Sequence, residues 1–411
     1  MFFLRECQEG ILIMECLAIN GGKPVRETYL AYGRQSVDDS DICAVIDTLK
    51  SDFLTTGPKV DEFEKAIAQY VGAKYAVALS NGTAALHAAC YAAGIEEGDE
   101  VIVSSMTFAA SSNCVLYCGG KPIFVDIDPS TYNIDVNKIE AAITEKTKAI
   151  IPVDFTGQSV DMDSIRKIAD KYNLLIIEDA AHALGSEYKG CKVGTKSDMT
   201  EFSFHPVKPI TTGEGGVVVT NNEELYKKLQ LFRSHGITRD ESLMNKNEGP
   251  WYYEQIDLGY NYRITDIQCA LGLNQIKRLD SFLERRREIV RIYNSAFKNM
   301  NEIITPFEEE YSNSGWHIYV IKLDLTMLTV GRKEIFEALK AENIGVNVHY
   351  IPVYMHPYYK SLGYKKGLCP EAEKLYDSII TLPLFPEMTD KDIEDAINAI
   401  KKVISYYSKD K

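Results

Sequence analysis

Lys208 is the residue of this sequence whose local setting best suits covalent chemistry. Pro206 and Pro209 bracket it and keep it out of a helix, and Gly213 lets the following chain turn sharply. An amine that is held in one place with few charged neighbours can form a Schiff base with a carbonyl compound or with pyridoxal phosphate. A surface lysine in a loop rich in Gly and Pro would show the same local pattern, so other parts of the chain must decide.

Asp179 ends a buried strand, and this placement points to a cation beside it. The apolar run Leu-Leu-Ile-Ile at 174–177 leads into Glu178 and Asp179, and a carboxylate buried there is costly unless it meets a cation or hydrogen-bond donors. The protonated pyridine nitrogen of pyridoxal phosphate would be such a cation, and the ring could then act as an electron sink. His182 could contact the same ring, although a purely structural histidine explains it about as well.

A phosphate site is expected where a predicted strand ends in Ser-Asn-Gly-Thr at 80–83 and an alanine-rich helix begins. The free amides of a helix N-terminus and a nearby hydroxyl bind anions well, although capping of the helix is the commoner role of Ser80 or Thr83. Ser203, just upstream of the lysine, could add a second hydroxyl. Phe108 follows the next predicted strand and could lie flat against an aromatic ring, although core packing is its commoner role.

Helices and strands alternate through the middle of the chain. The apolar patterns predict strands at 75–79, 101–103, 122–127, 149–153 and 174–177, with helices at 84–93, 107–117, 138–143 and 162–172 between them. This alternation predicts an α/β fold with a mostly parallel sheet covered on both faces. Ligands of such sheets bind at the carboxyl ends of the strands, which is where the residues named above fall.

The flanking regions read differently. Helices are predicted at 38–51 and 60–70, and a long helix at 265–297. A strand at 344–350 suggests a smaller α+β domain after that helix.

Composition limits the remaining alternatives. The chain has 411 residues, a net charge of −14 and 45% hydrophobic residues, which argues against a nucleic-acid or anionic-membrane binder. Its nine cysteines show no metal-ligand spacing, so we expect reduced thiols in a cytoplasmic protein and no metal site. Charged residues interrupt the apolar stretches of residues 1–19, so we expect no signal peptide or membrane span. Residues 1–28 are expected to be a poorly ordered extension, in which Met14 could be the natural start.

Five motifs together resemble the sugar-nucleotide aminotransferase (DegT) family of fold-type I pyridoxal-phosphate enzymes. They are Ser-Asn-Gly-Thr-Ala-Ala-Leu at 80–86, Glu-Asp-Ala-Ala-His at 178–182, Phe-Ser-Phe-His-Pro-Val-Lys at 202–208, Gly-Glu-Gly-Gly at 213–216 and Gly-Tyr-Asn-Tyr-Arg at 259–263. The resemblance runs from about Tyr29 to the C-terminus. It implies a large domain over 29–265, with an N-terminal arm and a mixed, mostly parallel sheet between helices. A smaller C-terminal α+β domain, beginning with the long helix, would follow over 266–411.

Further motifs resemble the branch of this family that acts in pseudaminic acid biosynthesis. They are Val-Asp-Phe-Thr-Gly at 153–157, His-Ala-Leu-Gly-Ser-Glu-Tyr at 182–188, Lys-Pro-Ile-Thr-Thr at 208–212, Phe-Arg-Ser-His-Gly at 232–236 and Val-His-Tyr at 348–350. Many relatives have a histidine where Asp154 stands. That branch transfers an amino group from L-glutamate to C4 of a UDP-linked 4-keto-6-deoxy-N-acetylhexosamine. Family members with histidine in place of the lysine are dehydratases, and Lys208 argues against that activity here.

The resemblance also implies roles for individual residues. Lys208 and Asp179 would be catalytic, the lysine by bonding to the cofactor and moving protons, the aspartate by pairing with the pyridine nitrogen. Contacts with pyridoxal phosphate are expected from these two residues and from Gly82, Thr83, Phe108, His182, Ser203 and Asn261. Contacts with the sugar nucleotide are expected from Tyr32, Asp52, Phe53, Leu54, Thr55, Val348, His349, Tyr350 and Ile351. Asn261 would reach the phosphate from the neighbouring subunit, which makes the enzyme a homodimer with shared active sites.

Two alternatives stay open at this point. The chain could aminate another 4-keto or a 3-keto nucleotide sugar, because epimers differ only in the placement of one hydroxyl group. It could also be a non-catalytic regulatory protein on the same fold. The contact for the carboxylate of glutamate, or of the product 2-oxoglutarate, is open between Arg233, Arg239 and Arg263.

Overall fold

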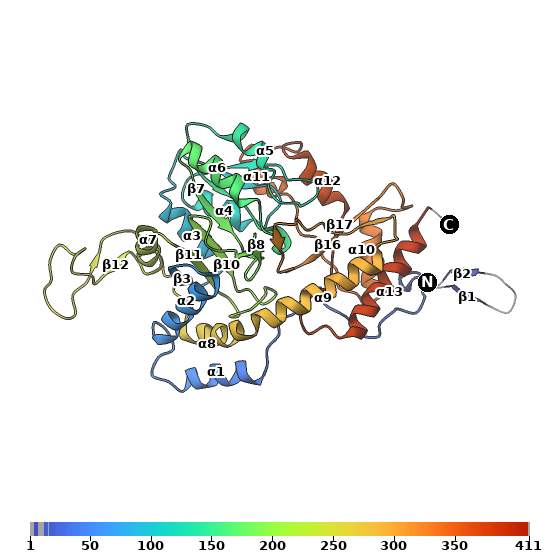
Figure 1. Ribbon diagram of the computed structural model, residues 1–411, viewed down its shortest axis with the longest axis horizontal. Coiled ribbons are helices and arrows are strands. Elements are labelled where there is room, and N and C mark those ends of the chain that lie inside the picture. The colour runs from blue at the N-terminus through green and yellow to red at the C-terminus, as the bar shows by residue number, and fades with distance from the viewer. Residues whose placement is uncertain (1–3, 7–11, 15, 410–411) are drawn as a thin grey trace.

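The computed structural model describes residues 4–6, 12–14 and 16–409, and its centre is a seven-stranded sheet in the order β3-β11-β10-β7-β6-β4-β5 (Figure 1). The strands are β3 (Tyr75–Leu79), β4 (Glu100–Ser104), β5 (Lys121–Val125), β6 (Thr147–Ile151), β7 (Leu175–Asp179), β10 (Met199–Ser203) and β11 (Gly216–Thr220). Strands β10, β7, β6, β4 and β5 run parallel to one another, whereas β11 is antiparallel to both β3 and β10. The expected mixed, mostly parallel sheet is confirmed.

Helices cover both faces of this sheet, so apolar side chains on both sides of its strands are buried. Ile177 of β7 and Met199 of β10 pack with helices α3, α4 and α7 on one face. Ile176 of β7 packs with α6 on the other face, and Phe202 of β10 packs there with α2, α8 and the start of α9. The covering helices are α2 (Pro58–Val71), α3 (Gly82–Ala92), α4 (Ala110–Tyr117), α6 (Met162–Tyr172), α7 (Glu223–Arg233), α8 (Asp266–Gln275) and α9 (Leu279–Phe297). Burial on both faces explains why the strands read as near-continuous apolar runs.

A smaller antiparallel sheet, β14-β16-β17, lies at the far end of α9 (Figure 1). Tyr319 and Leu382 of this sheet pack with Ile400 and neighbouring residues in a separate apolar core. Its elements are β14 (Ile303–Ile304), β16 (Tyr319–Leu323), β17 (Ile379–Leu382), α10 (Arg332–Ala341) and α13 (Asp390–Tyr407). This sheet and its helices match the expected C-terminal α+β domain.

Residues 16–28 pack along the small domain. Leu17 is fully buried, and the backbone amides of Ala18 and Val25 each donate a 2.9 Å hydrogen bond to the Glu342 carboxylate. The rest of the predicted extension includes residues 1–3, 7–11 and 15, which lie outside the described residues.

The remaining elements are short or peripheral, apart from α1. They are α1 (Asp39–Leu49), α5 (Val136–Ile139), α11 (Pro357–Ser361), α12 (Pro370–Ser378), β1 (Leu4–Glu6), β2 (Leu12–Met14), β8 (Glu187–Tyr188), β9 (Cys191–Lys192), β12 (Ile237–Thr238), β13 (Glu254–Gln255) and β15 (Ser312–Asn313). Strands β12 and β13 pair in an arm that projects from the body (Figure 1). Within the part of the chain that the structure describes, no helix combines the length and apolar content needed to cross a membrane.

Two sequence-based expectations about elements were wrong. The predicted helix over 265–297 is divided into α8 and α9 by a 3-10 turn at Ile276–Arg278. The predicted strand at 344–350 forms only isolated bridges, at Ile344 with Leu30 and at Asn347 with Thr381.

Asp266 joins the loop before α2 to the start of α8, and its loss should destabilise the fold. Its buried carboxylate accepts hydrogen bonds from Gly57 N (2.7 Å) and Lys59 N (2.9 Å). Replacement by alanine leaves both amides without this acceptor, so we expect the free energy of unfolding to fall by about 2–3 kcal/mol in denaturant titrations. Asp170→Ala removes a largely exposed carboxylate near Arg166 and should cost less than ~0.5 kcal/mol. Equal losses in the two variants would contradict this role.

Candidate active site

Asp179 is the last residue of β7 and is buried beside α4. Ser111 Oγ of α4 donates to Asp179 Oδ2 (2.5 Å), and Ala181 N donates to Oδ1 (3.2 Å). Burial raises the pKa of Asp179, and Ser111, Ala181 and the Lys208 amine offset part of that rise. An ionised carboxylate has about four lone-pair sites, so it can accept a further N–H donor.

Lys208 lies near Asp179 in the loop between β10 and β11, where its backbone N donates to His205 O (2.9 Å). Burial lowers the pKa of the Lys208 amine to about 8, while the carboxylate of Asp179 offsets part of the effect. At pH 7 roughly a tenth of such an amine is neutral, which is the form that attacks a carbonyl group. The structure therefore brings the predicted lysine and aspartate into one electrostatic site.

Three buried histidines share the neighbourhood of this lysine. His182 Nε2 lies 3.1 Å from the Tyr350 hydroxyl, and its ring centroid lies 4.5 Å from that of His317. His349 Nδ1 lies 2.8 Å from Thr381 Oγ1. Burial lowers the pKa of each histidine, and the Lys208 ammonium lowers each further. All three are therefore neutral near pH 7 and add no second positive charge beside the lysine.

Several residues expected to bind the sugar or the ring meet at the same place. The Tyr32 ring lies 5.4 Å from that of His349, and the Phe108 ring lies 6.1 Å from that of Tyr350. Phe108 is 61% exposed, so its face is not committed to the core. Val348 and Ile351 lie on either side of His349 and Tyr350 in the sequence.

The start of α3 passes very close to β10. A Cβ on Gly82 would lie 2.6 Å from Glu201 Oε1 and 3.0 Å from Ser203 Oγ, so any larger residue there would force these side chains to shift. Asn81, not Ser80 or Thr83, caps the helix, because its side chain accepts from Ala84 N (2.8 Å). Thr83 and Ser203 are half-buried, and the hydroxyl of neither residue caps the helix.

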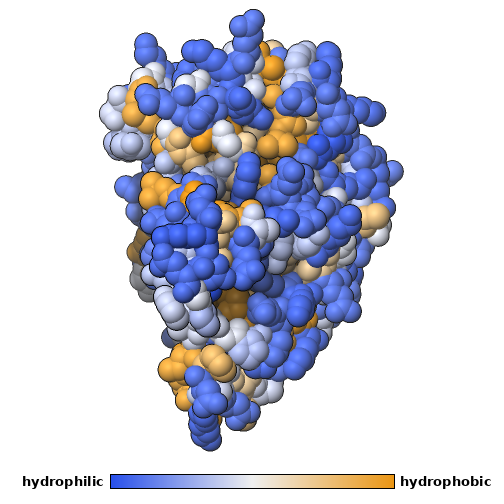
Figure 2. Space-filling view, turned by 90° about the vertical axis from the view of Figure 1, so that its left-hand side faces the viewer, coloured by the Kyte–Doolittle hydropathy of each residue, from blue (hydrophilic) through white to orange (hydrophobic). Residues whose placement is uncertain are grey.

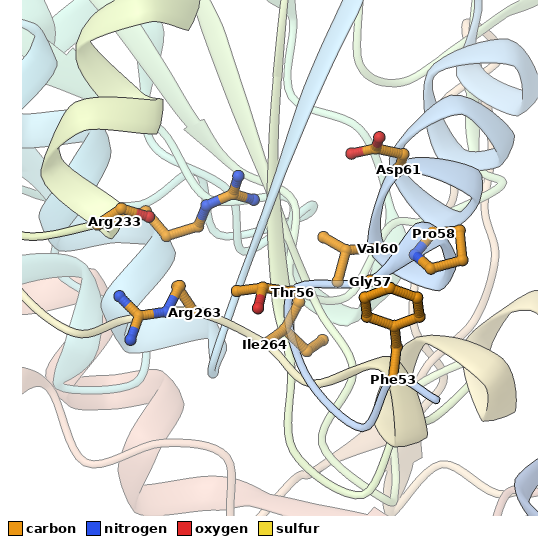
Figure 3. Close-up of a pocket in the computed structure, with 10 residues that line it drawn as sticks. Phe53, Thr56, Gly57, Pro58, Val60, Asp61, Arg233, Arg263 and Ile264 are labelled. Atoms are coloured by element: carbon orange, nitrogen blue, oxygen red, sulfur yellow. The ribbon is translucent and has the colours of Figure 1, made fainter. Parts of the chain in front are cut away.

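Of residues 52–55, Phe53 alone lines a different cavity. Phe53 lines a space of about 370 Å³, in which Arg233 and Arg263 form one wall and Phe53 and Pro58 the opposite one (Figure 3). Leu54 O accepts from Asp266 N (3.1 Å), and Thr55 pairs with Thr265. Asp52 is exposed.

Asn261 is exposed and belongs to the same region as this cavity. Its backbone pairs with Ser234, a residue of the cavity wall. Among the described contacts, none joins Asn261 or residues 52–55 to Lys208 or Asp179 of the same chain.

Sequence reasoning missed Ser111 and Glu201. Glu201 carried a visible signal, a charged residue in the otherwise buried strand Met199–Ser203, which is the signal that singled out Asp179. Ser111 offered only its place on the helix after Phe108, and its role depends on how closely α4 packs on β7.

This arrangement fits pyridoxal phosphate. Asp179 can hold a protonated ring nitrogen, Lys208 can bond to an aldehyde, and the tight approach at Gly82 leaves helix amides free for a phosphate. Within the described residues, no group of three or more His, Cys, Asp or Glu side chains is arranged to hold a metal ion. Fold and site together define a fold-type I enzyme that depends on pyridoxal phosphate.

Comparison with known sequences gives the family. The pattern of the DegT/DnrJ/EryC1/StrS aminotransferase family matches residues 35–401. A UDP-4-amino-4,6-dideoxy-N-acetyl-beta-L-altrosamine transaminase of Campylobacter jejuni (strain 81-176) is 45% identical over 88% of this chain and 94% of its own length. The spore coat polysaccharide biosynthesis protein SpsC of Bacillus subtilis is 44% identical over 92% of this chain and 98% of its own.

Solved structures agree. Helicobacter pylori PseC, an aminotransferase involved in the biosynthesis of pseudoaminic acid, has a TM-score of 0.87 and 33% identity, covering 92% of this chain and 100% of its own. Streptococcus pneumoniae Spr1654 in its PLP form has a TM-score of 0.86 and 34% identity, covering 92% and 99%. The chain belongs to the DegT/DnrJ/EryC1/StrS family and is a sugar-nucleotide aminotransferase with pyridoxal phosphate as its cofactor.

Ser111 should contribute to cofactor binding through Asp179. In Ser111→Ala the carboxylate loses its shorter hydrogen bond, its pKa rises, and the anion that faces the ring nitrogen is less favoured. We expect the Kd for pyridoxal phosphate, measured by equilibrium dialysis of the apoenzyme, to rise by about tenfold. The neighbouring Ser112 lies 2.7 Å from the Tyr359 hydroxyl, so Ser112→Ala is a matched control that should leave this Kd unchanged. Equal Kd values for the two variants would contradict this role of Ser111.

Proposed function

We propose that this enzyme transfers the amino group of L-glutamate to C4 of a UDP-linked 4-keto-6-deoxy-N-acetylhexosamine, in pseudaminic acid biosynthesis. One observation carries the proposal. Lys208 and Asp179 lie close to the aromatic residues Tyr32, His349 and Tyr350 at the carboxyl edge of the sheet. Two relatives with this activity or pathway in their names, from Campylobacter and Helicobacter, support the choice of substrate.

Pyridoxal phosphate, when bound, supplies an aldehyde and an electron-withdrawing ring. In our proposal Asp179 keeps the ring nitrogen protonated, and Ser111 holds this carboxylate in place. Lys208 Nζ would hold the cofactor through its aldehyde group, and the amine would move a proton between the cofactor carbon and the substrate carbon. An amine with a pKa near 8 suits both directions of this transfer near neutral pH.

Other predicted residues would hold and orient the ligands. We propose that Gly82, Thr83 and Ser203 bind the phosphate, while Phe108 and His182 flank the ring. Tyr32 and residues 348–351 would contact the sugar nucleotide.

The structure reduces the three arginines that could bind the glutamate carboxylate to two. Arg233 forms an ion pair with Glu64 and donates to Ala78 O (2.9 Å), so its charge is already used. We propose Arg239 or Arg263 for this contact.

We propose that the enzyme is a homodimer in which Asn261 and residues 52–55 complete the neighbouring active site. Large apolar side chains are exposed on and beside the β12–β13 arm, including Trp251 (70%) and Leu258 (72%), and this arm projects from one face of the molecule (Figure 1). Figure 2 shows patches of apolar side chains on this face, one of them at its lower end over α1. Exposed patches of this kind mark interaction surfaces.

Two further expectations are kept as proposals. The described cysteines are free thiols, which supports a cytoplasmic location. Residues 29–265 and 266–411 are proposed as two domains, since the small antiparallel sheet has an apolar core of its own.

Lys208→Ala should abolish the reaction. Wild-type enzyme loaded with pyridoxal phosphate should absorb at the edge of the visible range, and glutamate should convert this absorbance to that of the amine form of the cofactor. The variant loses the bond to the cofactor, so we expect both signals to vanish and turnover to fall at least ~1000-fold. Lys189→Ala, which removes an exposed lysine paired with Asp163, should behave as wild type. Retained turnover in Lys208→Ala would refute the assignment.

A hybrid dimer tests whether the active site is shared. Lys208→Ala and Asn261→Asp should each be inactive, the second because a carboxylate repels the cofactor phosphate. If Asn261 serves the neighbouring site, a hybrid of the two chains holds one doubly altered site and one intact site, and activity returns on mixing. If both residues serve the same chain's site, every site in the hybrid is defective and no activity returns.

The identity of the sugar has its own test. The alternative is another 4-keto or a 3-keto nucleotide sugar. SpsC, a spore coat polysaccharide biosynthesis protein, shows that similar sequences occur in other pathways. Each 4-keto epimer and a 3-keto nucleotide sugar are offered separately with glutamate, and NMR reads the position and configuration of the new amino group. Our proposal expects amination at C4 of the 6-deoxy-N-acetylhexosamine; preference for a 3-keto sugar would overturn it.

A further inference from the structure

Glu201 is a buried acid that the proposed reaction does not use. It lies in β10 directly beside Asp179 of β7 in the parallel register, and its carbonyl accepts from Ala180 N (3.0 Å). Its side chain has 0% exposure, and within the described part of the chain neither carboxyl oxygen has a hydrogen-bond partner. Because Gly82 lies against Glu201 Oε1, the acid sits between Asp179 and the proposed phosphate site.

Two acids therefore share one lysine, and their surroundings decide which of them is charged. Asp179 receives hydrogen bonds from Ser111 and Ala181, whereas Glu201 receives none. A buried carboxylate without donors is strongly disfavoured against its neutral form. Burial and the charge of Asp179 raise the pKa of Glu201 well above its usual value, and Lys208 offsets only part of the rise. Burial raises the pKa of both acids, but only Asp179 has hydrogen-bond donors that offset the rise, so the two acids can take different protonation states.

We propose that Glu201 stays protonated beneath the cofactor and acts as a positioning residue, which leaves Asp179 as the single carboxylate anion facing the ring nitrogen. This inference rests on the cofactor placement proposed above. A negatively charged Glu201 would repel the Asp179 carboxylate. It would also repel a phosphate bound at Gly82 and Ser203. The neutral acid avoids both effects while filling the space beneath the helix N-terminus.

The groups that face Glu201 come from five elements, one of which is α3, where Gly82 carries no side chain. Asp179 faces it from β7, Lys208 from the loop after β10 and Cys114 from α4, while Val218 of β11 lies opposite it in the antiparallel register and is apolar. Since Lys208 also titrates, a binding test needs a probe that cannot bond to it. Pyridoxamine phosphate, which has an amine in place of the aldehyde, is such a probe.

The first test is the charge of Glu201 in the apoenzyme. The unfolded chain ionises this residue above about pH 4.3, whereas the folded chain keeps its proton, so its contribution to stability is lost as pH rises. Above pH 6 the unfolding equilibrium constant of the wild type should therefore rise relative to that of Glu201→Gln, by up to roughly tenfold for each pH unit over which the folded chain keeps the proton. The infrared difference between the two proteins at pH 7 should show the carbonyl stretch of a protonated carboxylic acid. A constant ratio of unfolding constants, or a carboxylate band instead, would overturn the proposal.

The second test is binding of pyridoxamine phosphate at pH 7. Glu201→Gln should bind it within about threefold of the wild type, because one neutral group replaces another. Binding more than ~10-fold tighter in the variant would mean that a negative charge had been removed, which would refute a protonated Glu201. Glu178→Gln, a buried acid on β7 held by Ser197 and Thr200, is the matched control and should not change the affinity.

The charge of Glu201 can still be decided if the variant does not fold or if the wild type does not bind the cofactor. If Glu201→Gln does not fold, Glu201→Met provides a neutral side chain of similar length for the same comparisons. If the wild type binds neither form of the cofactor, the proposed function fails, whereas the infrared and stability measurements still decide the charge of Glu201.

Discussion

The burial of a carboxylate at the end of β7 is the constraint on which this active site depends. Removing Asp179 from water disfavours its charge, so the anion persists only because other elements bring partners to it. Helix α4 brings the Ser111 hydroxyl, and the loop after β10 brings the Lys208 amine because β10 is the direct neighbour of β7 in the sheet. In our proposal the cofactor's ring nitrogen would complete this set of partners and so tie the fold of the apoenzyme to its ligand.

Few of the ionisable side chains around Asp179 carry a charge. Three histidines are neutral because burial lowers their pKa values, and the proposal for Glu201 makes that acid neutral as well. Asp179 and Lys208 then remain as the facing charged pair. In a site with little water, fixed charges act more strongly than in solution and need little reorganisation during the reaction. The same burial that makes the site costly to fold therefore also makes it effective for chemistry.

The fold and the proximity of Lys208 to Asp179 were predictable from sequence because each depends on a local pattern. The apolar run before Asp179 predicts a buried strand ending in an acid, and parallel strands place their carboxyl ends at one edge. The details that sequence missed depend on distances between elements: the hydrogen bond from Ser111, the cap by Asn81 and the fit of Glu201 under Gly82. The turn at Ile276–Arg278 and the lack of a strand at 344–350 reflect tertiary packing, which local apolar periodicity does not encode.

The most direct test of the central claim locates the covalent bond between protein and cofactor. Enzyme loaded with pyridoxal phosphate is reduced with borohydride, digested and analysed by peptide mass spectrometry. The account predicts one modified peptide, with the reduced cofactor on Lys208. Modification of a different lysine, or no stable adduct at all, would contradict it.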